Sequence, residues 1–511
     1  MMKRKYDFIN DYFEFNKDVF IYGAGIYARY ALNICKMFKA NVLGFITTSY
    51  EKDELYGLPV YEVKIINENY KSINLIPGFK GCSVENLCVF EIDIYYLDII
   101  LNIDTVNDIL YHKAILNIRE SFNYFPVYSE AKSWKNTLII RLDAIGDLVC
   151  TTPLIREIKE NIKNGNNDVL IQAKNADVVV TNPYIDHLFV MHEKEIYSSP
   201  LTEPDILFQL ITEAKEFVMS NQIKEHLDAV ILPMKLLEGR NATMSLIIAV
   251  AYHPDNILAW TDENECGLWV REITKSIVNH IHIIDEPMHE SQYHLEMLRR
   301  EGININNKKD DIFIYKPKFT NKFILKKYIN HRKIAVGIVG SDENRNWKVN
   351  RYNELFELYK DCDAIFIVLG GDDAQESAEQ IIHNNNVVNL VKKTTLKETI
   401  ELLNICDIYV GSNTGLMHIA AALGKPCVTL YSVMKDVSPW NGNSPHRYGV
   451  KNVPHIDLLP DQGLDDCEGY CHKNYSHCIN QISVTEVSKA INCLLNIDNL
   501  HKRNNINEVN I

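Results

Sequence analysis

The chain has 511 residues, with 53 Lys and Arg against 67 Asp and Glu, and therefore a formal net charge of −14. This acidic balance argues against a nucleic-acid-binding protein, because contacts with phosphates need clustered Lys and Arg. Apolar residues make up 46% of the chain and charged residues 23%, which is ordinary for a globular protein. The length suggests about three domains.

Neither a membrane span nor an export signal is expected. The longest predominantly apolar stretches, such as residues 244–252, fall short of the ~20 residues that a spanning helix needs. The basic N-terminus is followed at once by Asp7 and Asp11, which is unlike a signal peptide. Twelve cysteines in such a chain indicate reduced thiols and a cytoplasmic protein.

Residues 1–132 form the first predicted domain. An apolar run at 19–22, a glycine turn, a helical pattern through Phe38 and an apolar run at 41–47 are typical of the start of a doubly wound α/β domain. Gly23, Gly25 and Ala28 fit the dinucleotide-binding pattern G-x-G-x-x-A. The second predicted strand ends without the acidic residue that binds ribose, so NAD is not expected. No cofactor is expected for the chain.

Residues 136–325 form the second predicted domain, after a linker at 131–136. An apolar strand at 137–142 runs into the polar turn that holds Asp143, Gly146 and Asp147, and a helix follows. A carboxylate at this strand end could take a proton from an attacking hydroxyl. The alternative is that Asp147 only caps the helix.

Residues 331–498 form the third predicted domain, with strands expected at 333–339, 364–369, 408–410 and 428–431. Each predicted strand ends in Gly, Ser, Asn or Asp, and ligands of parallel α/β sheets bind at the carboxyl ends of strands. The helix expected at 416–423 begins after Asn413 and Thr414, so its N-terminus could hold a pyrophosphate. The alternative is an ordinary capped helix, in which His418 is a packing residue.

Two further groups of residues are candidates for binding. Arg345 and Lys348 follow a strand end and could clamp phosphates, unless they belong to a solvated loop. Cys467, Cys471 and Cys478 lie close in sequence to His472 and His477, and these are residue types that bind zinc. Their spacing is not a standard one, so packed thiols are the alternative to a structural metal cluster.

Two segments resemble glycosyltransferase family 9, the heptosyltransferase-like enzymes of lipopolysaccharide synthesis. Residues 136–159, NTLIIRLDAIGDLVCTTPLIREIK, resemble the opening of this family, and residues 410–431, VGSNTGLMHIAAALGKPCVTLY, resemble its donor-binding turn and helix. Arg345 stands two places before Trp347, where the family carries a basic residue. The first 130 residues resemble a small Rossmann-like domain that is fused to several bacterial sugar-modifying enzymes.

The resemblance implies a GT-B fold, two Rossmann-like domains facing a cleft, preceded by the small α/β domain. The second domain would bind the acceptor and the third the nucleotide-sugar. Asp147 matches the catalytic base of an inverting reaction that needs no bound metal, and Asp143 and Gly146 belong to the acceptor-side turn. The matches to the donor site are Arg345, Asn413, Thr414, Gly415, Leu416 and His418.

The implied substrates are a nucleotide-diphosphate sugar, which we expect to be an ADP-linked heptose or a related sugar, and a glycan acceptor. The acceptor would be lipopolysaccharide or another surface glycan, free or lipid-linked, so peripheral association with the inner face of the cytoplasmic membrane is also expected. One alternative is a non-catalytic GT-B protein that only binds nucleotide-sugars or serves as a scaffold. It is favoured by Asn413, where the family usually has Asp, whereas the retained Asp147 favours an enzyme.

Overall fold

The protein is described by a computed structural model in two compact units. Unit 1 combines Met1–Ser129 with Lys194–Ile284, and unit 2 combines Glu130–Glu193 with Asp285–Ile511. The predicted domain bounds 1–132, 136–325 and 331–498 stay predictions. The structure describes residues 18–22, 26–47, 54–62, 75–77, 103–161, 165–192, 203–235, 239–261, 274–305, 311–315, 328–340, 342–465 and 467–495.

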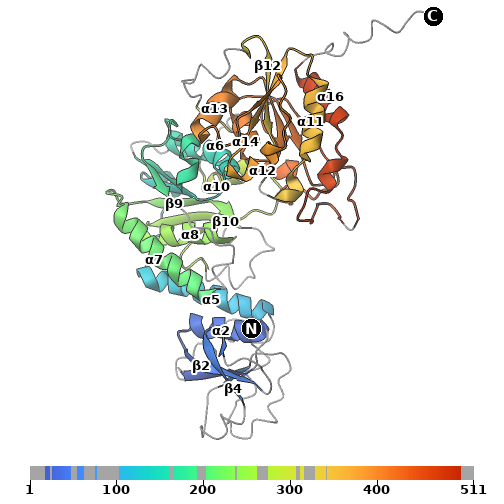
Figure 1. Cartoon of the computed structure of the whole chain (residues 1–511). Coiled ribbons are helices and arrows are strands. Elements are labelled where there is room, and N and C mark those ends of the chain that lie inside the picture. Colours follow the sequence, from blue (N-terminus) through green and yellow to red (C-terminus); the bar gives the residue numbers. More distant parts are fainter. Residues whose placement is uncertain are drawn as a thin grey trace, which may run out of the picture. The chain divides into compact units, whose positions relative to one another are not determined.

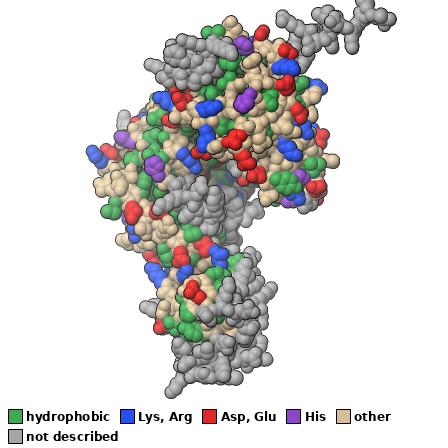
Figure 2. Space-filling view, viewed as in Figure 1, with side chains coloured by type: hydrophobic (Ala, Val, Ile, Leu, Met, Phe, Trp, Pro, Cys, Tyr) green, Lys and Arg blue, Asp and Glu red, His purple; other side chains and the backbone are tan. Residues whose placement is uncertain are grey.

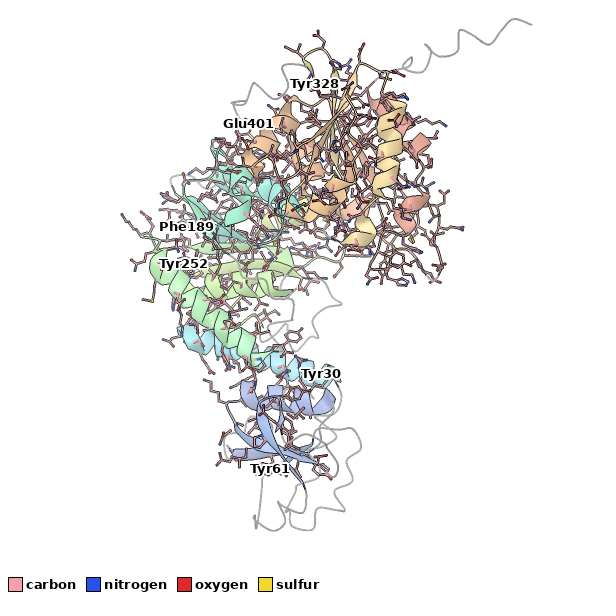
Figure 3. The ribbon with its side chains drawn as sticks, in the orientation of Figure 1. Tyr30, Tyr61, Phe189, Tyr252, Tyr328 and Glu401 are labelled. Atoms are coloured by element: carbon pink, nitrogen blue, oxygen red, sulfur yellow. The ribbon has the colours of Figure 1, made fainter. Side chains whose placement is uncertain are left out.

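Unit 1 begins with a small sheet in the order β3-β4-β2-β1-β5. Its strands are β1 (Asp18–Tyr22), β2 (Asn41–Thr47), β3 (Glu54–Leu55), β4 (Leu58–Glu62) and β5 (Leu75–Pro77). All neighbours pair in parallel except β3, which is antiparallel to β4. Tyr61, labelled in Figure 3, belongs to β4. Its ring packs edge to face on Phe20 at 5.9 Å between ring centroids. The α/β start of the chain is thus confirmed, although Gly23 and Gly25 lie outside the described residues.

Helices join this sheet to the second part of unit 1. Helix α2 (Ile26–Met37) contacts α5 (Ile103–Phe122) and α7 (Pro204–Ser220), and α5 also contacts α8 (Gly239–Ala251). Arg29 on α2 pairs with Glu203 at 2.9 Å, and Lys36 pairs with Asp205 at 2.5 Å. Unit 1 also contains three parallel strands, β9 (Ala229–Lys235), β10 (Asn256–Thr261) and β11 (His280–Ile283).

Unit 2 begins at a segment that the sequence led us to expect as a linker. Residues 131–133 form a short 3₁₀ helix, and Trp134 is buried, so this segment is anchored by packing and is not a free linker. Strand β6 (Thr137–Arg141) then pairs in parallel with β7 (Asn167–Gln172), which pairs with β8 (Leu188–Met191). Helix α6 (Ile145–Asn161) follows β6 directly, as predicted.

The larger part of unit 2 is a parallel six-stranded sheet in the order β14-β13-β12-β15-β16-β17. Its strands are β12 (Arg332–Gly337), β13 (Ala364–Leu369), β14 (Val387–Asn389), β15 (Ile408–Ser412), β16 (Cys427–Leu430) and β17 (His455–Leu458). Numbered from β12, this is the order 3-2-1-4-5-6 of a doubly wound sheet, and the order reverses between β12 and β15. All four strands predicted in this region are confirmed, with ends that differ by at most two residues.

Helices cover both faces of this sheet. Helices α11 (Val349–Leu358) and α16 (Val484–Leu494) lie on one face, and α13 (Leu396–Ile405) and α14 (Gly415–Ala422) lie on the other (Figure 1). The core beneath α11 and α16 includes Trp347, Phe356 and Phe366, all buried. Burial on both faces explains why β13 is apolar throughout, with the sequence AIFIVL.

Among the described residues, no helix is long and apolar enough to cross a membrane. On the face in view in Figure 2, Lys and Arg side chains are interspersed with Asp and Glu over the described surface. The described part of that face therefore carries charges of both signs.

Candidate active site

A cavity of about 880 Å³ opens in unit 2 at the point where the strand order reverses. It is lined by the turn that begins α6, by the segment that follows β12, and by the turn between β15 and α14. Ligand crevices of doubly wound sheets lie at this place, outside the carboxyl ends of the strands. The cavity lies within the size range of small-molecule and cofactor sites.

The N-termini of α6 and α14 lie close together in the wall of this cavity. A Cβ atom added to Gly415 would lie 2.9 Å from Cβ of Ile145, and one added to Gly146 would lie 2.6 Å from Cδ2 of His418. Only glycine permits this approach at either position. Two helix N-termini present unpaired backbone N–H groups and positive partial charge, so the cavity suits an anionic group.

Arg345 adds a full positive charge to the same wall. It ends a short 3₁₀ helix at Glu343–Arg345, and its guanidinium Nη2 donates to the carbonyl oxygen of Asn413. The hydroxyl of Ser412 donates in turn to the carbonyl of Arg345, at 2.5 Å. These two bonds connect the segment after β12 with the end of β15. They fix the guanidinium of Arg345 against the turn that begins α14. Burial lowers the pKa of Arg345, although Asp342 opposes this effect.

Asp147 faces the cavity from the first turn of α6. Its Oδ1 accepts hydrogen bonds from Nη2 of Arg141 at 2.9 Å and from the hydroxyl of Tyr448 at 3.0 Å. Its Oδ2 has no hydrogen-bond partner within the part of the chain that the structure describes. The carboxylate is thus fixed through one oxygen, and the other is available to a ligand.

Arg141, the last residue of β6, is almost completely buried and lies among several acids. It pairs with Asp147, with Asp143 at 3.2 Å and with Glu290 at 3.2 Å. Burial alone would lower the pKa of Arg141, but Asp143, Asp147 and Glu290 together raise it above its ordinary value. Arg141 is therefore a permanent cation that holds Asp147 in place.

Glu290 begins α10 (Glu290–Arg300) and is only 1% exposed. Burial by itself would raise the pKa of Glu290, but His294, Arg141 and Arg447 lower it well below the ordinary value. His294 lies one turn further along α10, and its Nδ1 is 3.2 Å from the carbonyl oxygen of Cys150, which can only accept. Nε2 of His294 lies 3.3 Å from Nη1 of Arg141 and 3.3 Å from Oε1 of Glu290.

Tyr448 completes the surroundings of Asp147. It ends the short helix α15 (Pro445–Tyr448), next to Arg447, whose Nε lies 3.3 Å from Glu290. Burial, Asp147 and Glu290 raise the pKa of Tyr448 well above its ordinary value, so the phenol stays protonated and donates to Asp147.

His418 lies in the second turn of α14 and is buried against Gly146. Burial lowers its pKa to about 3, and His289 adds to this effect, so the imidazole is neutral at pH 7. Its Nδ1 lies 3.9 Å from Sγ of Cys150. His418 reaches the cavity wall, but its closest contacts are those of a packing residue.

We expect the buried neutral imidazole of His418 to make unit 2 sensitive to acid. An unfolded histidine titrates near pH 6.5. Between about pH 6.5 and about pH 3 the unfolded chain therefore binds the additional proton, so this contribution to stability is present above pH 6.5 and is lost as the pH falls. In His418→Gln the slope of the unfolding free energy against pH should fall by up to about 1.4 kcal/mol per pH unit. Urea unfolding between pH 7.5 and pH 4 measures both slopes, and equal slopes would contradict the burial of a neutral imidazole.

The cavity brings together most of the residues that the sequence predicted for the site. These are Gly146, Asp147, Arg345, Asn413, Thr414, Gly415, Leu416 and His418. Asp143 is held by Arg141 and is not part of the cavity wall, and Lys348 is exposed outside it. Cys467, Cys471 and Cys478 form a separate cluster. The roles assigned to all these residues stay predictions.

Several residues of the site were missed from the sequence. The network around Asp147 adds Arg141, Glu290, His294, Arg447 and Tyr448, and the cavity wall adds Lys174, Asp372 and Asp373. Asp372 and Asp373 follow β13 after two glycines, so the rule of strand ends already pointed to this segment, although neither residue was named as a site residue. Tyr448 carried no such signal, because it lies 301 residues from its partner Asp147.

The comparisons with known proteins include a family model and curated relatives. Residues 280–448 match the model of glycosyltransferase family 9 (heptosyltransferase). A lipooligosaccharide heptosyltransferase 2 from Campylobacter jejuni is 26% identical over 186 residues, which are 35% of this chain and 55% of that relative. The chain thus spans about half the length of this curated relative.

Solved structures of low sequence identity share the fold. The glycosyl transferase family 9 structure from Veillonella parvula matches with a TM-score of 0.55 and 18% identity, over 72% of this chain and 99% of that one. ADP-heptose LPS heptosyltransferase II from E. coli matches with a TM-score of 0.51 and 16% identity, over 70% and 98% of the two chains. The expected GT-B fold is therefore confirmed, and residues 280–448 of the chain are similar to glycosyltransferase family 9 (heptosyltransferase).

Proposed function

We propose that the protein is an inverting glycosyltransferase. It transfers a heptose or a related sugar from an ADP-linked donor to lipopolysaccharide or another surface glycan. The observation that carries this proposal is that Asp147 lines the same cavity as Arg345 and the N-terminus of α14, while its Oδ2 has no hydrogen-bond partner among the described residues. The names of the family 9 relatives, which include heptosyltransferases that act on lipopolysaccharide or lipooligosaccharide, support this choice of substrates.

The donor diphosphate would lie against the turn that begins α14. The backbone N–H groups at Thr414 and Gly415 and the guanidinium of Arg345 are the donors that a diphosphate needs. Lys174 lines the cavity as well and adds a second positive charge. Asp372 and Asp373 are carboxylates at a strand end, a type of residue that binds ribose hydroxyls, so we infer that the nucleoside lies toward β13.

The reaction would be a single displacement. Oδ2 of Asp147 takes the proton of the acceptor hydroxyl, whose oxygen forms a bond to the anomeric carbon from the face opposite the diphosphate. The bond from that carbon to the diphosphate oxygen breaks, and ADP leaves with the electron pair. Arg345 and the N-terminus of α14 stabilise the charge that grows on the leaving group, so the proposal needs no bound metal for the chemistry.

The network behind Asp147 would prepare it for this role. Arg141 and Tyr448 both bind Oδ1, so they fix the carboxylate without blocking Oδ2. Glu290 balances the charge of Arg141 and fixes its orientation. A base that is held in one position loses less entropy in the transition state.

A panel of nucleotide-sugars tests the proposed activity. ADP-, GDP- and UDP-linked heptoses and hexoses are incubated with the protein and a lipopolysaccharide core acceptor, and the released diphosphate is quantified. We expect ADP-heptose to give the fastest release, and proton NMR of the product to show the anomeric configuration inverted. Retained configuration, or no release with any donor, would contradict the proposal.

Arg345→Ala should weaken ADP binding by about 10- to 150-fold, because losing a charge-assisted hydrogen bond typically costs about 1.5–3 kcal/mol. Arg345→Lys should retain part of the affinity, since it keeps the charge but loses the planar fork. Lys348→Ala, which changes an exposed basic residue of the same segment, is the matched control and should bind ADP normally. Calorimetric titration with ADP measures all three, and equal affinities would show that the diphosphate lies elsewhere.

The second candidate function is a nucleotide-sugar-binding protein without catalysis. It is favoured by Asn413, whose backbone carbonyl accepts from Arg345 and whose amide side chain supplies no charge near the donor. Tight ADP-sugar binding without product in the panel assay would support this candidate.

If transfer is observed, we also infer a cytoplasmic location at the inner face of the membrane, where a lipid-linked acceptor is presented.

A further inference from the structure

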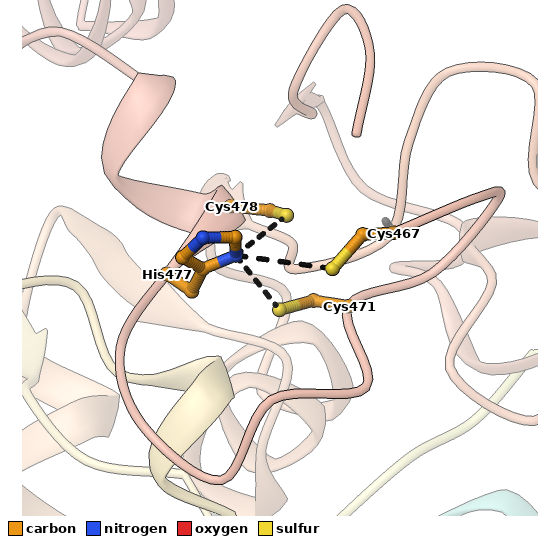
Figure 4. A group of neighbouring side chains, drawn as sticks. All are labelled: Cys467, Cys471, His477 and Cys478. Atoms are coloured by element: carbon orange, nitrogen blue, oxygen red, sulfur yellow. Dashed lines mark hydrogen bonds between the residues drawn. The ribbon is translucent and has the colours of Figure 1, made fainter. Parts of the chain in front are cut away.

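Four side chains that could bind a metal meet in the loop between β17 and α16. They are Cys467, Cys471, His477 and Cys478, and their ligand atoms all lie within 4.8 Å of one another (Figure 4). Nδ1 of His477 lies 3.2 Å from Sγ of Cys478, 3.7 Å from Cys471 and 3.8 Å from Cys467. The three thiols thus surround one imidazole nitrogen.

These distances fit the edges of a tetrahedron around a metal ion. Bonds of about 2.3 Å from zinc to sulfur and about 2.0 Å from zinc to nitrogen give a sulfur-to-nitrogen edge of about 3.6 Å. The three measured edges lie close to this value. Hydrogen bonds alone would not require all three thiols to converge on one nitrogen, because that nitrogen has one lone pair.

The surroundings of the cluster match those of a structural site. The three cysteines are buried at 0–5% exposure and pack with Met434, and the ligand set of three thiols and one imidazole leaves no position open. Closed tetrahedral sets of this kind are typical of structural zinc, whereas catalytic sites keep an open position. The other nitrogen of His477, Nε2, lies 3.1 Å from Oδ2 of Asp465. A carboxylate that accepts from Nε2–H leaves the lone pair on Nδ1, which is the arrangement of carboxylate–histidine–zinc triads.

We propose that Cys467, Cys471, Cys478 and Nδ1 of His477 bind one structural Zn²⁺ ion, with Asp465 orienting the imidazole. Binding converts the three thiols to thiolates and releases their three protons to solvent. The site lies outside the cavity described above and plays no part in the chemistry there. Its role is to hold together a loop that otherwise contains little regular structure.

The loop in turn supports the segment that carries Arg345. Nδ2 of Asn344 donates to the carbonyl of Cys471 at 2.8 Å, and the hydroxyl of Ser476 donates to the carbonyl of Asn346. Loss of the ion should therefore loosen the neighbours of Arg345 on both sides. If the proposed function holds, ADP affinity should fall with the metal content, although the site itself does not depend on that function.

Metal analysis of the purified full-length protein tests the site directly. We expect about one equivalent of zinc per chain, lost in Cys471→Ser and in Cys478→Ser. Cys406→Ser changes a buried cysteine outside the cluster, so it should retain the zinc and is the matched control. In Asp465→Asn the ion should stay bound but with about 10- to 100-fold lower affinity.

Two further measurements on the wild-type protein test the metal site even if a cysteine variant fails to fold. Cobalt(II) added to metal-depleted wild-type protein should give the intense visible bands of a tetrahedral thiolate complex. Zinc should then displace the cobalt and raise the melting temperature by about 5 °C or more. Wild-type protein that contains no zinc and binds no cobalt would overturn the proposal, and so would a disulfide between two of the three cysteines. One equivalent of tightly held iron would overturn the assignment to zinc.

Discussion

Asp147→Asn is expected to lower turnover by about 10²- to 10⁴-fold, which is the usual contribution of a general base. The amide has nearly the shape of the carboxylate but cannot take the acceptor proton. It can still accept hydrogen bonds from Arg141 and Tyr448 through its oxygen, so the local packing is retained. The rate of ADP release with saturating donor and acceptor measures the effect.

The control for this variant is Asp361→Asn, which changes an exposed carboxylate outside the cavity and should leave turnover unchanged. ADP binding by Asp147→Asn should remain near that of the wild type, because Oδ2 faces the acceptor and not the diphosphate in our account. Turnover within about twofold of wild type would remove Asp147 from the role of base.

Glu290→Gln is expected to lower the free energy of unfolding by about 3–5 kcal/mol, because it removes one partner from a buried network of charges. Glu290 is almost completely buried, and Arg141, Arg447 and His294 all lie within 3.3 Å of its carboxylate. With the charge removed, Arg141 is compensated only by the partly exposed Asp143 and Asp147. Urea unfolding at pH 7 measures the change.

Glu296→Gln lies on the same helix and supplies the matched control. Glu296 pairs with Arg299 and Arg300, but all three side chains are partly exposed, and surface pairs of this kind contribute about 0–1 kcal/mol. The free energy of unfolding of the two variants should also depend differently on pH. Because the pKa of Glu290 is lowered in the folded protein, its stabilisation is present at neutral pH and is lost on acidification. If both variants lowered the free energy of unfolding equally, the buried charges around Glu290 would contribute no more stability than the partly exposed ion pairs of Glu296.

The elements of the doubly wound sheet could be predicted from the sequence because each depends on local signals. Strand β13 is an unbroken apolar run that ends in two glycines, and α14 begins after Asn413 and Thr414. Both Arg345 and Gly415 follow strand ends, so their meeting at the point where the strand order reverses follows from topology alone.

The network behind Asp147 could not be predicted, because its members come from distant parts of the chain. Glu290 lies 149 residues from Arg141, and no local pattern indicates that the first residue of α10 will be buried against it. The sequence also did not indicate that residues 1–129 and 194–284 form one compact unit, because this depends on contacts between distant segments. Helix α5 packs on α7 and α8, which follow much later in the chain, and these contacts depend on tertiary structure.

A crystal structure of the protein with ADP tests the central claim most directly. We predict that the diphosphate lies in the cavity of unit 2, with its oxygens within hydrogen-bond distance of the backbone N–H groups at Thr414 and Gly415 and of the Arg345 guanidinium. The Oδ2 atom of Asp147 should then face the space beyond the terminal phosphate, where a sugar would be attached. A diphosphate bound away from the N-terminus of α14, or one that contacts Asp147 itself, would contradict the account.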